Sequence, residues 1–310
     1  MARGWRLIDL TGASGNLSGS RGRIVFQPEG GEKKSLPAED LAVVLAGPGT
    51  ALTTGALHYL AKHDVVLLVA DWRGVPYLAL NPWKQHGRVA ARQIAQADLS
   101  LPRKKNAWMR IVSAKVTGQG SNLKVLDRPG SQRMQILADS VRSGDPQNIE
   151  GTAARHYWSR LFDGYPDFIR DQRLGDSINA ALNYGYMVLR GYTIRAVAAA
   201  GLASPLGIFH RNRENYFNLV DDLIEPFRPA VDFQVAQLPH GSSVSDPETK
   251  KALVNAANQT FTSDGGRIPS VLEDFAQQFG RYVEGDISRI TAPVWRGPIE
   301  PNDRTDRDEE

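Results

Sequence analysis

Asp222 and Glu225 stand three residues apart in a short apolar segment, residues 217–232, with the sequence FNLVDDLIEPFRPAVD. On a helix this spacing puts both carboxylates on one face, beside the buried side of the segment. Carboxylates are rarely found in apolar surroundings unless a positive group holds them there. His210 lies 15 positions before Glu225, close enough for a loop to fold back over the helix. One imidazole with hard carboxylate oxygens suits Mg²⁺ or Mn²⁺ better than a metal that prefers thiolates.

A second interpretation of this segment needs no metal. Helix N-termini attract acidic residues, so Asp221 and Asp222 would then only complement the helix dipole. Pro226 limits how far such a helix can continue. The segment alone leaves both interpretations open.

Another acidic residue, Glu150, opens the segment IEGTAARHYWSRLF at residues 149–162. The apolar positions that follow recur at helical spacing, which predicts a helix with Glu150 in its first turn and its carboxylate in line with the packed face. The alternative is that Glu150 is a capping acid.

Taken together, these segments resemble a known family. EGTAARHYWSRLF, the lone His210 and DLIEPFRPAVD are similar to the three signature blocks of CRISPR-associated protein one, the CRISPR adaptation integrase and endonuclease family. Residues 175–191, GDSINAALNYGYMVLRG, resemble the central helix of that family. The blocks occur in the family's order, and the resemblance covers nearly the whole chain. The sequence of residues 217–232 is most similar to family members from systems that use a single large effector nuclease.

The resemblance implies a set of site residues. Glu150, His210 and Glu225 match the catalytic metal ligands of the family, with Mg²⁺ or Mn²⁺ as the expected ion, and Asp222 matches an acid that supports them. Asp221 falls at a variable position, so we expect it at the helix start or facing solvent. Two carboxylates balance the charge of a divalent ion, which would offset the negative charge that builds up when a phosphodiester is attacked.

The resemblance also implies the reaction and the partners. A 3′-OH of a short DNA duplex would attack a phosphodiester at the edge of a repeat, joining the two by transesterification without a nucleotide energy source. The expected partners are double-stranded DNA, a second copy of the chain and CRISPR-associated protein two. In that assembly the β-rich domain would carry the homodimer contact.

Composition sets limits on the class of protein. A chain of 310 residues with 41% apolar and 23% charged residues is large enough for two domains of a soluble protein. It has no cysteine, which excludes a disulfide framework and a zinc–thiolate site. We find no signal peptide and no apolar run long enough to cross a bilayer, so we expect a cytoplasmic protein without a membrane contact.

The order of the expected elements predicts an α+β protein of two domains. Residues 1–82 predict a small N-terminal β-rich domain, and residues 83–300 a larger all-α domain that binds metal and DNA. The acidic tail, residues 301–310, is expected to be disordered. Strands are expected at residues 5–10, 23–26, 41–45, 65–70 and 75–80, with one helix at residues 50–63. Further helices are expected at residues 86–97, 107–119, 132–142, 150–162, 176–200, 215–225, 246–260 and 270–284.

Basic residues are concentrated between residues 84 and 142, where 12 Lys and Arg face three Asp, an excess of +9. This local charge predicts a face that binds the phosphates of a duplex, although a solvated helical surface is the alternative. The candidate DNA contacts in this segment are Arg88, Arg92, Arg103, Lys104, Lys105, Arg110 and Lys115. Arg155, one turn beyond Glu150, is a further candidate for a phosphate contact, or else forms a surface salt bridge.

Two amides on the long central helix could support the site. Asn179 and Asn183 are four residues apart, which predicts a hydrogen-bonded network lining the site or, alternatively, a solvated stripe.

Three other functions stay open on the sequence. A free-standing metal-dependent DNA or RNA nuclease would use the same ligands with water as the nucleophile. A DNA-binding scaffold would use the acids only as helix caps and would bind DNA without a metal. A sugar- or peptide-directed metal hydrolase is disfavoured because it has no use for the basic segment.

Overall fold

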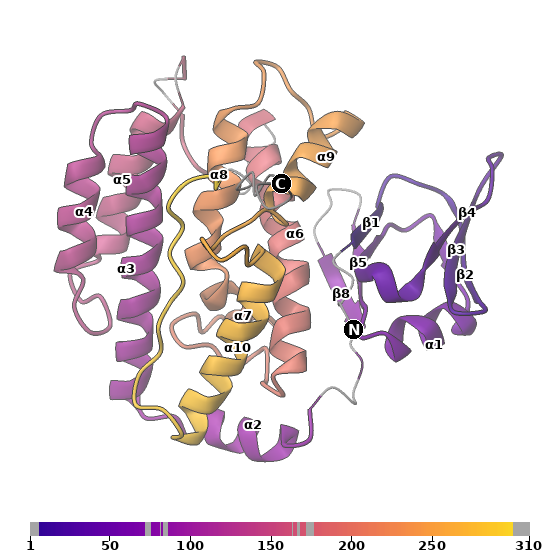
Figure 1. Ribbon diagram of the computed structural model, residues 1–310, viewed down its shortest axis with the longest axis horizontal. Coiled ribbons are helices and arrows are strands. Elements are labelled where there is room, and N and C mark those ends of the chain that lie inside the picture. Colours follow the sequence, from indigo (N-terminus) through magenta and orange to yellow (C-terminus); the bar gives the residue numbers. More distant parts are fainter. Residues whose placement is uncertain are drawn as a thin grey trace, which may run out of the picture.

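The computed structural model describes residues 6–71, 76–80, 82, 86–162, 164–165, 168–171 and 177–299. Within these residues a β-rich region comes first in the chain and a larger helical region follows it, side by side in space (Figure 1). This order confirms the predicted α+β architecture. The start of the first strand at residue 5, the cap of the central helix at residue 176 and the tail at residues 301–310 lie outside the described residues.

The β-rich region contains two four-stranded sheets. The first has the spatial order β1 (Arg6–Leu10), β5 (Leu41–Ala46), β7 (Val66–Ala70) and β8 (Pro76–Leu80). The second has the order β4 (Lys34–Pro37), β3 (Arg23–Pro28), β2 (Gly15–Ser20) and β6 (Thr50–Leu52). In the first sheet β1, β5 and β7 are parallel and β8 is antiparallel. Every residue of β5 is buried, as expected for the apolar run LAVVLA in a sheet covered on both faces.

Three strands were not predicted from the sequence. The strand β2 has the sequence GNLSGS, whose residues have low strand propensity. Its pairing with β3 and β6 stabilises it as a strand. The helix expected at residues 50–63 is shorter, α1 (Thr54–Lys62), because Thr50–Leu52 pairs with β2 as a strand. Thr53 follows that strand and caps the helix by accepting a hydrogen bond of 3.2 Å from the Ala56 N–H.

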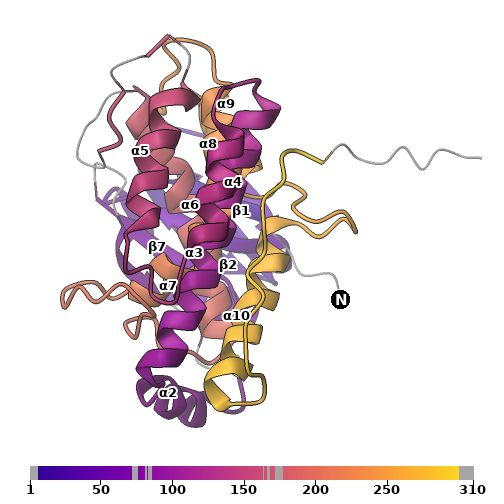
Figure 2. The ribbon, with the colours of Figure 1, turned by 90° about the vertical axis from the view of Figure 1, so that its left-hand side faces the viewer.

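The helical region has a central helix with others around it. Its elements are α2 (Val89–Ala97), α3 (Leu101–Val125), α4 (Ser131–Ser140), α5 (Ile149–Leu161), α6 (Ser177–Ala199), α7 (Asn218–Leu223), the short 3₁₀ turn η2 (Glu225–Phe227), α8 (Arg228–Ala236), α9 (Pro247–Ala256) and α10 (Ile268–Glu284). The views in Figures 1 and 2 place α3, α4 and α5 together on the side remote from the sheets, with α6 inside. Gly191 of α6 approaches the first sheet so closely that a Cβ there would lie 3.0 Å from Val43 Cγ1.

The segment after His210 differs from the single helix expected over residues 215–225. It forms α7, then η2, and then a separate helix α8 that begins directly after Phe227. Pro226 and Pro229 stand in the first turns of η2 and α8, where a missing backbone N–H costs no internal hydrogen bond. Proline therefore separates two helical elements here and does not end the helical segment.

A C-terminal strap, residues 286–299, follows α10 and runs back along α3 in both ribbon views (Figures 1 and 2). It inserts Trp295, which is fully buried against the rings of Phe233 and Phe261. Its indole N–H donates a 2.7 Å hydrogen bond to Asn122 Oδ1 on α3. Among the described residues, no helix is both long and apolar enough to cross a membrane.

Candidate functional site

Glu150 and Glu225, predicted as metal ligands, meet at one positive charge. Lys115 Nζ, on α3, lies 2.6 Å from Glu150 Oε1 and 2.6 Å from Glu225 Oε2. Glu150 stands in the first turn of α5, and Glu225 is the first residue of η2. Three elements that are far apart in the sequence therefore bring two carboxylates to the same ammonium.

The start of α5 is fixed by its own caps, and these caps position Glu150. Asp145 accepts hydrogen bonds from the Ile149 N–H at 2.8 Å and from the Glu150 N–H at 2.9 Å. Asn148, with φ 50°, accepts a bond from the Gly151 N–H at 3.1 Å. These bonds satisfy N–H groups that the first turn of a helix leaves without partners.

Glu225 is held mainly by charge. It is buried, and Arg228 Nε lies 2.9 Å from its Oε1. Burial alone would raise its pKa, but Arg228 and Lys115 together lower the pKa below its ordinary value. Glu225 Oε2 and Arg228 Nε have charged neighbours at contact distance but no hydrogen bond of good geometry. A carboxylate held by non-directional attraction suits a metal ion as well as it suits an ammonium.

His210 belongs to a second pair, with Asp222. Its Nδ1 lies 2.7 Å from Asp222 Oδ1, and this hydrogen bond raises the pKa of His210 above its ordinary value. The same buried carboxylate accepts hydrogen bonds from the N–H groups of Ile208, Phe209 and His210 at 2.5, 3.1 and 3.2 Å. Asp222 therefore fixes both the loop and the imidazole that the loop carries. The loop turns at Gly207, where a Cβ would lie 2.3 Å from the His210 carbonyl oxygen.

The predicted ligands do not all converge on one point. Within the ranges that the structure describes, no group of three or more His, Cys, Asp or Glu is close enough to hold a metal ion. The part that fits a divalent cation is the carboxylate pair, whose oxygen donors already surround a cation. For His210, a hydrogen bond at Nδ1 leaves Nε2 as the nitrogen that could bind a metal.

Asp221, expected at the helix start or in solvent, lies in the first turn of α7 but does not point into solvent. Its Oδ2 accepts hydrogen bonds from Arg190 Nη2 at 2.9 Å and from Asn215 Nδ2 at 2.7 Å. Its partners and those of Asp222 are different, although the two residues are adjacent.

The amides of Asn179 and Asn183 lie in a hydrogen-bonded network and do not form a solvated stripe. Their Oδ1 atoms accept hydrogen bonds from Arg170 Nη1 at 2.8 Å and Nη2 at 2.7 Å. Asn179 is also fully buried and donates to the Ile169 carbonyl oxygen at 3.0 Å.

A buried carboxylate that the sequence did not single out lies next to this network. Asp232 of α8 accepts hydrogen bonds from Tyr157 OH at 3.2 Å and from Tyr186 OH. Tyr157 OH in turn accepts a hydrogen bond of 2.8 Å from Asn122 Nδ2. Burial raises the pKa of Asp232 to about 7. The only signal in the sequence was that Asp232 closes the apolar segment that also holds Glu225.

Several candidate DNA contacts are engaged within the protein. Arg92 is buried and bonds to Glu284 Oε2 at 2.9 Å and to the Ala200 carbonyl oxygen at 2.7 Å, so it presents no surface for a phosphate. Arg88 is exposed and pairs with the same carboxylate at 2.8 Å. Arg103 stacks 4.2 Å over the ring of Tyr282.

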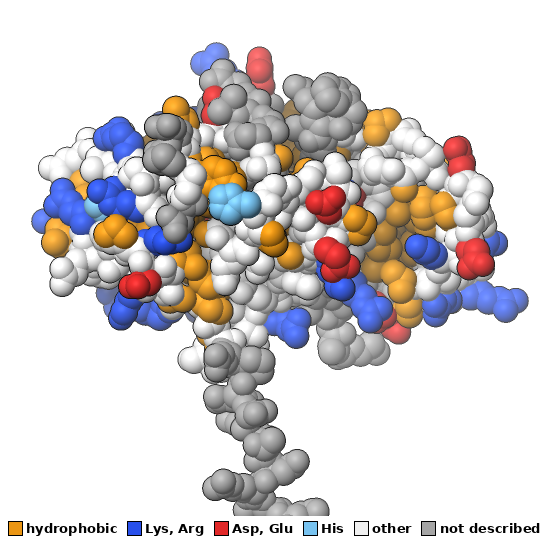
Figure 3. Space-filling view, turned by 90° about the horizontal axis from the view of Figure 1, so that it is seen from above, with side chains coloured by type: hydrophobic (Ala, Val, Ile, Leu, Met, Phe, Trp, Pro, Cys, Tyr) orange, Lys and Arg blue, Asp and Glu red, His pale blue; other side chains and the backbone are white. Residues whose placement is uncertain are grey.

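Other basic residues lie at the surface. Lys105 and Arg155 are exposed, whereas Lys104 and Arg110 are half-buried. Lys and Arg side chains also gather at the end formed by α3, α4 and α5 (Figure 3, left). Lys124 and Arg133, which the sequence analysis did not single out, are exposed at the adjoining ends of α3 and α4.

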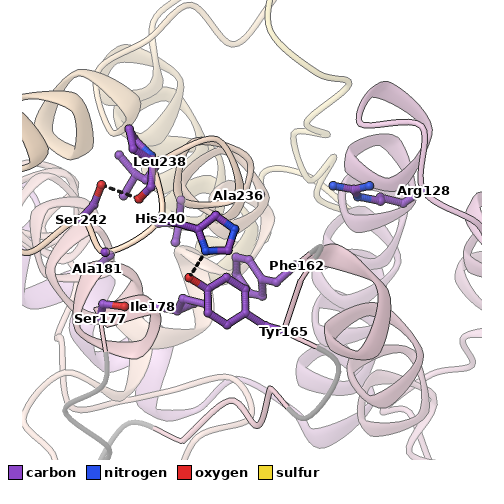
Figure 4. A pocket seen from close by; sticks show the side chains of 13 residues that line it. Arg128, Phe162, Tyr165, Ser177, Ile178, Ala181, Ala236, Leu238, His240 and Ser242 are labelled. Atoms are coloured by element: carbon purple, nitrogen blue, oxygen red, sulfur yellow. Dashed lines mark hydrogen bonds between the residues drawn. The ribbon is translucent and has the colours of Figure 1, made fainter.

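A pocket of about 210 Å³ lies elsewhere in the helical region (Figure 4). Tyr165 and His240 stack across it, with a hydrogen bond of 2.9 Å between Tyr165 OH and His240 Nδ1. It is lined by Phe162, which follows the end of α5, and by Ile178 at the start of α6. Glu150 lies at the opposite end of α5, so this pocket is separate from the carboxylate pair.

Comparisons with known proteins give matches to both the sequence and the fold. The sequence profile of the family described as CRISPR associated protein Cas1 matches residues 10–257. The chain is 37% identical over 239 residues to the CRISPR-associated endonuclease Cas1 of Neisseria meningitidis serogroup C (strain 8013), which covers 76% of each chain.

Two solved structures have a similar fold. A casposase bound to integration product matches with a TM-score of 0.76 and 21% identity, over 98% of this chain and 96% of that chain. A chain of a Cas6-RT-Cas1–Cas2 complex matches with a TM-score of 0.75 and 19% identity, over 96% of this chain and 36% of that chain. The family match spans most of the sequence, and the arrangement of strands and helices is shared. The chain therefore belongs to the CRISPR associated protein Cas1 family.

Proposed function

We propose that this chain is a metal-dependent DNA integrase and endonuclease of CRISPR spacer acquisition. It joins the 3′-OH ends of short duplex DNA to repeat DNA by transesterification. The observation that carries the proposal is the meeting of Glu150 and Glu225 at one cation in a member of the Cas1 family. The Neisseria relative is named an endonuclease, and the casposase of similar fold is bound to integration product, so both support the same chemistry.

The cofactor in this proposal is Mg²⁺ or Mn²⁺, which the carboxylates of Glu150 and Glu225 would hold, with His210 as the third ligand that the resemblance implies. When bound, such an ion offsets the charge of the attacked phosphodiester and makes the attacking hydroxyl more acidic. Asp222 holds the His210 ring by its Nδ1 and so orients Nε2. Arg228 remains beside Glu225 and keeps that buried carboxylate ionised. The bond broken and the bond made are alike, so the reaction needs no further energy source.

The proposed partners are duplex DNA, a second copy of the chain and the Cas2 protein. The last of these is supported by the Cas6-RT-Cas1–Cas2 complex, which contains a chain of similar fold. For the homodimer we propose the β-rich domain, residues 1–82, where the edge strand β8 leaves Tyr77 64% exposed, with Leu78 and Leu80 each 41% exposed. Such exposed apolar side chains on an edge strand are typical of an interaction surface. The helical domain, residues 83–300, would then carry catalysis and DNA binding.

A strand-joining assay tests the proposal. The chain and its Cas2 partner are mixed with a labelled short duplex that has 3′-OH ends and with a supercoiled plasmid carrying a repeat. We expect transfer of the label with Mn²⁺, and loss of transfer with EDTA or in the Glu150→Ala and His210→Ala variants.

Other outcomes of the assay point to other functions. Nicking of the plasmid without transfer of the label would favour a nuclease that uses water. DNA binding that is insensitive to EDTA, with no reaction, would favour a scaffold.

A further inference from the structure

Lys115 occupies a position that the sequence did not assign to it. It stands in the middle of α3, its side chain is only 14% exposed, and its ammonium lies at 2.6 Å from each of the two carboxylates. Burial opposes its charge, yet Glu225 and Glu150 raise the pKa of Lys115 above its ordinary value. The ammonium is therefore charged and lies between the two acidic residues that we propose as metal ligands.

Within the ion pairs that meet at this point, the charges balance. Glu150 and Glu225 carry two negative charges, and Lys115 and Arg228 carry two positive ones. A divalent ion added to this group would leave two positive charges in excess at a largely buried site, which is costly. Withdrawal of one of the two resident cations would therefore favour its entry.

Lys115 is the cation that can withdraw. Arg228 contacts only Glu225 of the pair and also lies 4.5 Å over the ring of Tyr186, which anchors its planar guanidinium. Of these two cations, Lys115 is the one that bridges both carboxylates. A lysine ammonium is a compact charge on a flexible side chain, so it can move away more readily than a stacked guanidinium.

We propose that Lys115 stands in for the divalent cation in the metal-free protein and competes with it for Glu150 and Glu225. The competition keeps the two carboxylates together before the ion arrives and weakens the binding of the ion to the free protein. This inference rests on the proposed metal site at these residues.

The test is a calorimetric titration of the full chain with Mn²⁺ at pH 8, without DNA, which measures the affinity for the ion. Lys115→Met keeps an unbranched side chain and removes the charge, so we expect Mn²⁺ to bind about tenfold more tightly, or more. Lys115→Arg keeps the charge, and its affinity should stay within about threefold of the wild-type value. Lys124→Met, an exposed position on the same helix, is the matched control and should leave the affinity unchanged.

The outcomes separate this inference from the proposed function. If Lys115→Met binds Mn²⁺ no more tightly than the wild-type protein, the role of Lys115 is overturned. If Glu150→Gln also abolishes Mn²⁺ binding, the metal site itself still stands. Mn²⁺ binding that Glu150→Gln does not affect overturns both. If Lys115→Met is unstable without metal, thermal unfolding decides. Mn²⁺ should raise its unfolding temperature more than that of the wild-type protein, and an equal or smaller rise overturns the inference.

Discussion

Asp222 is the residue on which the orientation of His210 depends. It contributes a carboxylate with no solvent exposure, one hydrogen bond to the ring and three to the backbone of the loop. Asp222→Asn keeps the shape but removes the charge that favours imidazolium. We expect the pKa of His210 to fall toward its ordinary value, measured by NMR titration, and Mn²⁺ affinity to drop by about 10–100-fold.

The neighbouring acid provides the control for this prediction. Asp221→Asn removes a carboxylate that bonds to Arg190 and Asn215, so it should change the His210 pKa much less. An equal effect of both substitutions would mean that the charge of the whole segment, and not the hydrogen bond to Asp222, sets the state of His210.

Asp232 predicts a pH dependence of stability. Its folded pKa of about 7 lies well above its ordinary value because the carboxylate is buried. Between these values the folded protein holds a proton that the unfolded chain has lost, so stability falls as pH rises toward 7, by up to about 1.4 kcal/mol per pH unit. Asp232→Asn cannot ionise and should flatten this slope between about pH 5 and pH 7 in urea unfolding. An unchanged slope would exclude Asp232 as its source.

At the level of single residues, the resemblance of four short blocks to the family indicated Glu150, His210, Glu225 and Asp222, whereas spacing alone left helix caps as an alternative. It gave no sign of the bridging role of Lys115, which looked like one more basic residue of α3. Lys115 and Glu150 are 35 positions apart in the sequence, and the packing of α3 against α5 brings them together. Spacing within one helix can be read from a sequence, but contacts between helices depend on crossing geometry.

At the scale of elements, α6 and α8 cross at a glycine. A Cβ on Gly185 would lie 2.4 Å from Cγ1 of the fully buried Val231, which cannot move without displacing its own neighbours. We expect Gly185→Ala to destabilise the protein, since overpacking costs about 1–3 kcal/mol and the gain in helix propensity returns at most about 1 kcal/mol.

Thermal unfolding measures this effect. Gly87→Ala is the matched control, because a Cβ at Gly87 meets nothing within 4 Å. Equal unfolding temperatures for the two variants would show that the crossing tolerates a methyl group.

The elements that the sequence predicted well are those whose pattern is decided locally. The apolar strands β5 and β7 and the long helices α5, α6 and α10 appear within a few residues of the expected bounds. The strand β2 depends on its partners, and the break between α7 and α8 depends on two prolines that each begin a new element. Strand pairing determines the first feature and backbone geometry the second, so neither can be predicted from the spacing of apolar residues.

At the scale of the whole molecule, the basic side chains between residues 84 and 142 fall into two classes. Some of these cations are tied to other parts of the chain, as Arg92 is to Glu284, and others, such as Lys105, face outward. If Lys105 contacts a phosphate, Lys105→Ala should reduce the log–log slope of duplex affinity against salt concentration by about 0.9. Arg92→Ala should leave that slope unchanged and lower stability instead, because it removes the buried hydrogen bonds of Arg92 to Glu284 and to the Ala200 carbonyl oxygen.

Fluorescence anisotropy with a labelled duplex at several salt concentrations measures the slope, and urea unfolding measures the stability. An unchanged slope for Lys105→Ala would remove this residue from the DNA-binding surface.

The C-terminal strap has a consequence for how the protein is made. Trp295 leaves the ribosome after the rings of Phe233 and Phe261, and its hydrogen bond to Asn122 of α3 joins residues 173 positions apart. Phe233 and Phe261 of the nascent helical region therefore lack their contact with Trp295 until the strap emerges. A chain ending at residue 290 lacks Trp295, so we expect protease to cut it much faster than the full chain. The contact between α3 and the strap therefore forms only after both α3 and α10 have been made.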